Sequence, residues 1–223
     1  MQTVENNRLS HCEFWDEFCR DFHEHASHLD TLNMWTSSAL FKLHSQLLLY
    51  NEYQHSLKMI STETIKNHNL VIPLFTDDIF RVNLIAITPE CSLPLHNHPG
   101  SSGAMMVISG NVRGIVCEQV DPVTTKKQMR SMLKVVENKI FIPNETSCFT
   151  KKQNNIHSIK ALTNRAVALV FHTPPFSTNQ QSYFFSATPL QKTGTHVVTQ
   201  RIQAYAFQKL RQSKLDHLRE LAK

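Results

Sequence analysis

The spacing of apolar residues divides the chain into three stretches. Residues 1–72 carry apolar side chains at intervals of three and four and contain no glycine or proline. Residues 73–198 carry short apolar runs separated by turn formers, and residues 199–223 return to the first spacing. Intervals of three and four mark one face of a helix, whereas alternation marks a strand. We therefore expect a helical N-terminal extension packed on a β-barrel domain, followed by a C-terminal amphipathic helix.

Two helices are predicted within the N-terminal extension. The first should run from about Ser10 to His28, because Ser10 and Glu13 form a capping box and apolar residues follow at helical spacing. The second should run from about Thr36 to Lys58, where leucines recur at helical spacing with few helix breakers. The boundary with the β-domain is expected near Pro73, since glycine and proline appear only from that point.

Nine apolar runs of the central stretch are predicted to be strands. Each is bounded by turn formers, and Gly110-Asn111 between two of the runs suits a tight hairpin turn. Short strands at this spacing predict an antiparallel sandwich or a small barrel, so the fold class is expected to be mainly β. The runs are Phe80–Thr88, Ala104–Ser109, Val112–Val120, Leu133–Val136, Lys139–Ile142, Thr146–Thr150, Ile156–Ala161, Ala166–His172 and Tyr183–Ser186.

Composition limits the classes of protein that the chain can represent. Of its 223 residues, 41% are hydrophobic and 18% are charged, which is typical of a globular protein. No apolar run approaches the roughly 20 residues that span a bilayer, and the N-terminus lacks the features of a secretory signal. A cytoplasmic protein is therefore expected.

Charge and cysteine content argue against further roles. The net charge is +5, but lysine and arginine are dispersed, so no nucleic-acid partner is expected. Asp216 and Glu220 dilute the basic face of the C-terminal helix, which favours docking on its own domain or a second subunit over a membrane. The five cysteines include no Cys-x-x-Cys pair, so reduced thiols are expected. Monomer and homodimer both stay open.

Two histidines two positions apart are the strongest chemical signal in the chain. His96 and His98 should project from one face of an extended strand, so that both imidazoles can reach one metal ion. His157, flanked by alternating apolar residues, is the best third ligand from a neighbouring strand. The sequence therefore predicts a metal site; the alternative is a pair of surface histidines beside a Pro-Gly turn.

The spacing around these histidines resembles the two motifs of the cupin family. His96-x-His98, Gly103 and Gly110 match the first motif, and Pro143 with His157 matches the second. The resemblance implies a double-stranded β-helix, or jelly roll. Gly103 stands where that family usually has a glutamate ligand, which leaves a three-histidine site.

The residues within the motifs are similar to those of cupin thiol dioxygenases, in particular the cysteamine dioxygenase and plant cysteine oxidase family. The matching stretches are Pro94–Gly100, Asn155–Ile159, Thr173–Ser177 and the pair Tyr183-Phe184. The resemblance implies Fe(II) bound by His96, His98 and His157, with a small thiol and O2 as substrates and a sulfinic acid as product. Three neutral imidazoles leave open coordination positions, which this chemistry requires.

Four further positions bear on the site, and one of them departs from the pattern of that family. Val170 stands where relatives commonly have an acidic residue, and His172, two residues later, is a hypothetical replacement polar group; a buried structural histidine is the alternative. The resemblance makes Tyr183 a candidate catalytic hydroxyl, with a packed strand aromatic as the alternative. Arg81 is expected to face solvent, because it alternates with Phe80 and Val82.

These observations predict a non-haem Fe(II) thiol dioxygenase acting on cysteamine, cysteine or an N-terminal cysteine. The lack of a recognisable carboxylate clamp favours an amino-thiol over free cysteine. One alternative is a cupin that uses Zn, Mn or Ni for isomerisation or hydrolysis, which elemental analysis would reveal. Another is a non-catalytic ligand-binding cupin, which would take up no oxygen with any thiol.

Overall fold

The computed structural model describes residues 13–62, 69–120, 130–174, 183–186 and 191–203. Three helices come first, α1 (Glu13–His25), α2 (Leu29–Leu47) and α3 (Asn51–Thr62), and twelve strands follow within these ranges. The mainly β fold class is thus confirmed. None of the helices described here combines the length and the apolarity needed to cross a bilayer.

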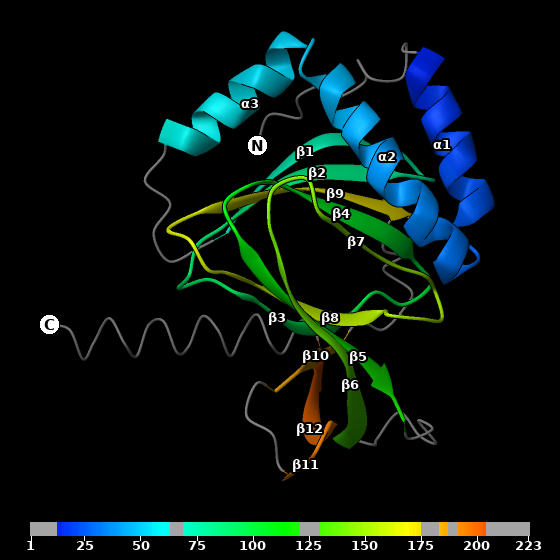
Figure 1. Ribbon diagram of the computed structural model, residues 1–223, viewed down its shortest axis with the longest axis vertical. Coiled ribbons are helices and arrows are strands. Elements are labelled where there is room, and N and C mark those ends of the chain that lie inside the picture. The colour runs from blue at the N-terminus through cyan, green and yellow to red at the C-terminus, as the bar shows by residue number, and fades with distance from the viewer. Residues whose placement is uncertain (1–12, 63–68, 121–129, 175–182, 187–190, 204–223) are drawn as a thin grey trace, which may run out of the picture.

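The strands form two sheets that face each other (Figure 1). The five-stranded sheet has the order β1 (Leu70–Thr76), β2 (Arg81–Ile87), β9 (Ala166–Thr173), β4 (Ser102–Ser109), β7 (Thr146–Phe149). The seven-stranded sheet has the order β10 (Tyr183–Phe185), β3 (Leu93–Asn97), β8 (Ile156–Ala161), β5 (Val112–Gln119), β6 (Arg130–Phe141), β12 (His196–Gln203), β11 (Gln191–Thr193). Every strand pair is antiparallel, as predicted.

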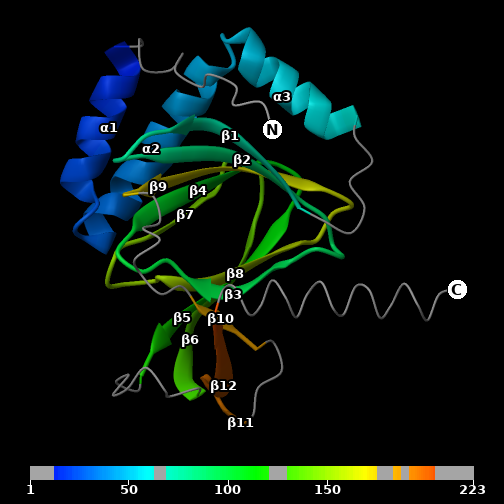
Figure 2. The same ribbon diagram turned by 180° about the vertical axis from the view of Figure 1, so that it is seen from behind.

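The helices cover the outer face of the five-stranded sheet (Figures 1 and 2). The predicted aromatic stripe of the first helix makes this contact, since the rings of Phe18 and Phe22 lie 5.1 and 4.3 Å from that of Phe171 on β9. Burying each such ring stabilises the fold by about 1.5–3 kcal/mol. As a result both faces of the sheet are covered, and all eight residues of β9 are buried.

The seven-stranded sheet bends back on itself below the barrel. Strand β10 pairs with β3 on one side and with β12 on the other, so β10, β3, β8, β5, β6 and β12 form a closed ring. The ring encloses its own apolar cluster of Cys117, Leu133, Ile156 and Phe185. A separate apolar cluster fills the interior between the two sheets.

Several predicted boundaries are wrong in detail. The segment Thr36–Lys58 is not one helix, because the chain turns at residues 48–50 without glycine or proline; there His44 Nδ1 and the Tyr53 hydroxyl approach to 2.7 Å across the turn. The runs Leu133–Val136 and Lys139–Ile142 belong to the single strand β6.

The two outer domain boundaries also shift. Strand β1 begins at Leu70 and contains Pro73, which an edge strand tolerates because its N–H is not needed by a neighbour. Strand β12 extends to Gln203, so the first five residues of the predicted helix 199–223 pair with β6 and β10 instead. The rest of that predicted helix lies outside the described residues, as do Ser10 and residues 175–182.

Candidate metal centre

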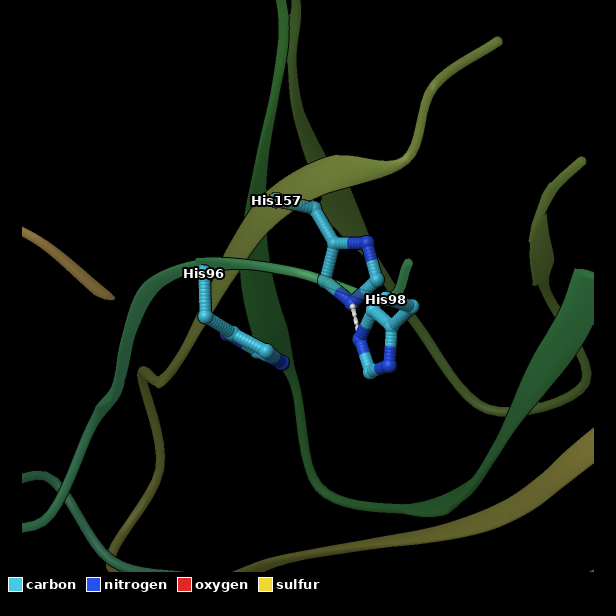
Figure 3. A group of neighbouring side chains, drawn as sticks. All are labelled: His96, His98 and His157. Carbon is cyan, nitrogen blue, oxygen red and sulfur yellow. Dashed lines mark hydrogen bonds between the residues drawn. The ribbon is translucent and has the colours of Figure 1, made fainter. Parts of the chain in front are cut away.

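The three predicted ligands meet at one end of the barrel. His96 on β3 lies opposite His157 on β8 in the strand register, so both side chains leave the same face of the sheet, and His98 follows β3 directly. The candidate nitrogen atoms of the three rings all lie within 4.8 Å of one another. Figure 3 shows the three rings converging from the two neighbouring strands.

Hydrogen bonds fix how two of these rings present their nitrogen atoms. The Nδ1 atom of His96 lies 2.7 Å from the carbonyl oxygen of Pro94. A carbonyl can only accept, so Nδ1 carries the proton and Nε2 keeps a lone pair. The His157 ring similarly forms a hydrogen bond with the backbone of Asn154, and its Nε2 faces His98. Such partners orient a ring for metal binding.

The three imidazoles are held in the neutral form. Burial lowers the pKa of His96, partly offset by its bond to Pro94. Burial, reinforced by the neighbouring histidines, lowers the pKa of His98 and of His157 well below the usual range. Neutral rings have lone pairs to offer, so the cluster is ready to ligate a cation near pH 7.

The spacing of the His98 and His157 nitrogen atoms fits a shared ion. The Nε2 atoms of His98 and His157 are 3.1 Å apart. Two ligands at right angles, each about 2.1 Å from one ion, would be about 3 Å apart. Within the part of the chain that the structure describes, these three histidines are the group of potential ligands whose donor atoms all lie within 4.8 Å of one another.

Gly103 is required where related sites have a carboxylate ligand. A Cβ atom there would lie 2.6 Å from Cζ of Phe149 and 2.6 Å from the backbone oxygen of Phe171. The Phe149 ring fills this space and stacks on His98, with ring centroids 4.7 Å apart. The site therefore has no room for a fourth protein ligand at this position.

His172 lies beside the cluster, although it is not within ligand distance of all three histidines. Its ring lies 5.1 Å from that of His98, and it stands opposite Gly103 in the register of β9 and β4. Its side chain is 5% exposed. Burial, with smaller effects of His96 and Arg81, lowers its pKa to about 3, so the ring stays neutral.

Arg81 does not face solvent, contrary to the prediction. It lies opposite His172 in the register of β2 and β9, and therefore points to the same interior face. The alternating neighbours Phe80 and Val82 are buried on the other face, beneath the helices. The prediction failed because it assumed that only one face of this sheet was covered.

Tyr183 is not brought to the histidines. Phe184 is the residue of β10 that lies opposite His96, with ring centroids 5.8 Å apart. Tyr183 instead packs against the apolar cluster of the closed ring of strands. Its backbone N–H donates to Oδ1 of Asn97 at 2.7 Å, so its link to the site is structural. The packed-aromatic alternative describes its position.

A small cavity of about 80 Å³ adjoins the histidines. Its walls are mostly apolar and extend into the barrel interior. They include Ile85, Met105, Val116, Ile159 and Val170, which occupies the position that is commonly acidic in the resembled family.

The described cysteines do not add a nucleophile to the site. Cys19, Cys91, Cys117 and Cys148 are all buried and form no disulfide, which agrees with the predicted reduced thiols. Burial raises the pKa of Cys117 to about 11 and that of Cys148 to about 12. A thiol with such a pKa is inert at neutral pH.

Asn155 is a supporting residue that the sequence interpretation did not assign. Its Oδ1 accepts from the backbone N–H of His98 at 2.6 Å. Its Nδ2 lies 2.9 Å from the backbone oxygen of His98 and within 3.2 Å of those of Ser101 and Thr150. This one side chain therefore ties the loop that carries His98 to the segment that leads into β8.

We expect Asn155→Ala to lower metal affinity by about 10- to 100-fold, as the loss of residues supporting metal ligands typically does. The reason is that the backbone of His98 loses its anchor while all three imidazoles stay. Competitive chelator titration would measure the change. The matched control Asn138→Ala removes an exposed amide on β6 and should change nothing; equal affinities for the two variants would refute the anchoring role.

Two facing sheets with three imidazoles at one end of the barrel define a cupin whose histidines could hold a metal ion. The sequence model of the PCO_ADO family, which comprises plant cysteine oxidases and cysteamine dioxygenases, matches residues 33–221. The chain belongs to this family, and membership implies thiol dioxygenase activity. A search of curated proteins finds no match.

Solved structures with related folds are only distantly similar. TT1209 from Thermus thermophilus has 19% identity and a TM-score of 0.40, covering 53% of this chain and 93% of that one. KdgF from Halomonas sp. has 10% identity and a TM-score of 0.37, covering 51% and 86%. An oxalate oxidase in complex with glycolate has 14% identity and a TM-score of 0.38, covering 54% and 57%.

Proposed function

We propose that the protein is an Fe(II) thiol dioxygenase that converts a small thiol into a sulfinic acid. The observation that carries the proposal is the gathering of three neutral imidazoles, without a carboxylate, beside a small apolar cavity. Family membership supports the same reaction class. One thiol and one O2 give one sulfinic acid, so the reaction balances without an external reductant.

His96, His98 and His157 would hold the iron. A ferrous ion in this setting would supply adjacent open coordination positions. Because the group of possible ligands found among the described residues contains no carboxylate to offset its charge, the ion would favour a thiolate ligand. The Pro94 carbonyl keeps the Nε2 lone pair of His96 directed to the cluster, and the Phe149 ring holds His98 in place. These contacts fix the ligands before substrate arrives.

The cavity walls determine what can accompany the sulfur. Apolar side chains such as Ile85, Met105 and Val170 exclude water from the reacting atoms. The small volume favours a short thiol, or the cysteine end of a larger molecule, and we propose cysteamine or an N-terminal cysteine ahead of free cysteine. His172 is a polar side chain of this cavity that can donate or accept a hydrogen bond.

The reaction is tested with the full chain, loaded with iron and supplied in turn with cysteamine, cysteine, 3-mercaptopropionate and a peptide with N-terminal cysteine. At least one thiol should gain the mass of two oxygen atoms, and with ¹⁸O2 both should carry the label. If a fully iron-loaded sample changes the mass of none of these thiols, the protein is not a thiol dioxygenase for these substrates and the proposal fails.

We expect His172→Phe to reduce turnover by about 10-fold or more, on the scale of one lost hydrogen bond near a reacting group. Phenylalanine keeps the ring and the buried shape but removes both nitrogen atoms. Initial rates of the iron-loaded variant, corrected for bound iron, would measure the loss. Unchanged turnover at equal iron content would show that His172 has only a packing role.

A further inference from the structure

We propose that Glu137 selects the substrate. It accepts a hydrogen bond from the ammonium group of an amino-thiol whose sulfur lies at the histidines. This inference rests on the proposed function and assigns a specificity-determining residue to it. Three observations support the role of Glu137: the strand register, a second cavity and the balance of charge around that cavity.

The register places Glu137 on the same row as the metal ligands. His157 on β8 lies opposite Val116 on β5, and Val116 lies opposite Glu137 on β6. Residues opposite each other in antiparallel strands point to one face, so Glu137 points to the interior as His157 does. Strands lie about 4.8 Å apart, which puts the two Cα atoms roughly 10 Å from each other.

A second cavity, of about 460 Å³, lies beside Glu137 and adjoins the histidine cavity. Phe141, Ser147, Cys148 and Asn154 line both cavities. Asn154 is also the backbone partner of His157. Glu137 therefore lines a cavity that shares a wall with the cavity of the histidines.

The larger cavity favours a cation. Lys139 also lines it, but its Nζ lies 3.1 Å from Oε1 of Glu145, so that charge is already offset. Glu137 forms no ion pair with any residue in the described part of the chain. Its charge also acts on the shared wall, where it adds to the larger effect of burial in raising the pKa of Cys148.

The distance suits a short amino-thiol. Two methylene groups separate nitrogen from sulfur by roughly 4 Å in an extended chain. Glu137 lies two strands from His157, with Val116 between them, and the register points its side chain to the same interior face. Glu137 would thus favour cysteamine or an N-terminal cysteine over 3-mercaptopropionate, whose carboxylate it repels.

The test compares three thiols of similar size that differ in charge: cysteamine, neutral 2-mercaptoethanol and anionic 3-mercaptopropionate. With iron-loaded Glu137→Gln, kcat/KM for cysteamine should fall about 10-fold, mainly through KM, as for the loss of a charge-assisted hydrogen bond. Turnover of 2-mercaptoethanol should stay within about twofold, because its hydroxyl can donate to the amide oxygen of glutamine as it does to the carboxylate and no interaction between charges is lost. Glu137→Lys should increase the relative rate with 3-mercaptopropionate.

Glu118→Gln is the matched control, since it removes an exposed carboxylate from the neighbouring strand β5. It should leave the preference for cysteamine unchanged. The inference is overturned if Glu137→Gln lowers the rates with cysteamine and 2-mercaptoethanol equally, or lowers neither. It is also overturned if the wild type prefers 3-mercaptopropionate and Arg81→Gln removes that preference.

Anaerobic calorimetry separates this inference from the proposed function. The wild-type protein could turn over no thiol and yet bind cysteamine about 10-fold more tightly than Glu137→Gln does. That result would refute the proposed reaction and support the recognition of the ammonium group by Glu137. The wild-type protein could instead oxidise thiols while it and Glu137→Gln bind cysteamine equally. That result would support the proposed reaction and refute the role of Glu137.

Discussion

Replacement of His157 by alanine should abolish stoichiometric iron binding and lower thiol oxidation by more than about 100-fold, because even residues that only support ligands account for 10- to 100-fold. His157 lies opposite His96 on the neighbouring strand, and its Nε2 is 3.1 Å from that of His98. Its removal leaves two ligands, which is too few to hold a ferrous ion against solvent. Bound iron and initial rates, measured on the same samples, test this expectation.

The control for this variant is His196→Ala, which removes an exposed histidine from β12. It should retain both iron and activity. A His157→Ala protein that folds, keeps one iron per chain and oxidises thiols normally would contradict the assignment of His157 as a ligand.

Alanine at Gly103 is expected to lower the free energy of unfolding by about 3 kcal/mol, at the upper end for an overpacked core. The added Cβ would meet both the Phe149 ring and the backbone oxygen of Phe171 at 2.6 Å. Gly103→Glu, which would restore the usual cupin ligand, should be more destabilising still. Chemical denaturation of the metal-free variants provides the measurement.

The second substitution Phe149→Leu provides an internal test of this steric argument. It should recover only part of the lost stability in Gly103→Ala, because the Phe171 oxygen belongs to the backbone and stays in place. A Gly103→Ala protein as stable as the wild type would show that the site can accommodate a side chain here, and the explanation for the missing carboxylate would fail.

The histidine cluster could be predicted because the geometry of His96 and His98 is local, and because His157, 59 positions beyond His98, has a strand-like flanking pattern and matches the second cupin motif. A spacing of two residues on an extended segment puts His96 and His98 on one side, and the apolar pattern around His157 marked a strand. The prediction of a mainly β fold depended on the same short-range periodicity. None of these inferences required knowledge of which strands pair.

The orientation of Arg81 and Tyr183 could not be predicted in this way. The helices bury the outer face of β2, which makes the interior the remaining direction for Arg81. The pairing of β10 with both β3 and β12 creates a second apolar interior, and this interior takes up Tyr183. Both outcomes depend on tertiary packing that leaves no local pattern.

The roles proposed for Glu137 and Asn155 depend on register. Glu137 faces the interior because β6 pairs with β5 in a register that includes an irregularity between Val116 and Cys117. Asn155 reaches His98 across 57 positions of sequence. An asparagine beside a histidine indicates no such contact until the loops are placed.

Diffraction at the iron absorption edge, from crystals of the iron-loaded protein, would show which side chains hold the metal. We expect one strong anomalous peak per chain, within bonding distance of ring nitrogen atoms of His96, His98 and His157. A peak bonded to fewer than these three residues, or ordered iron elsewhere with the cluster empty, would contradict it.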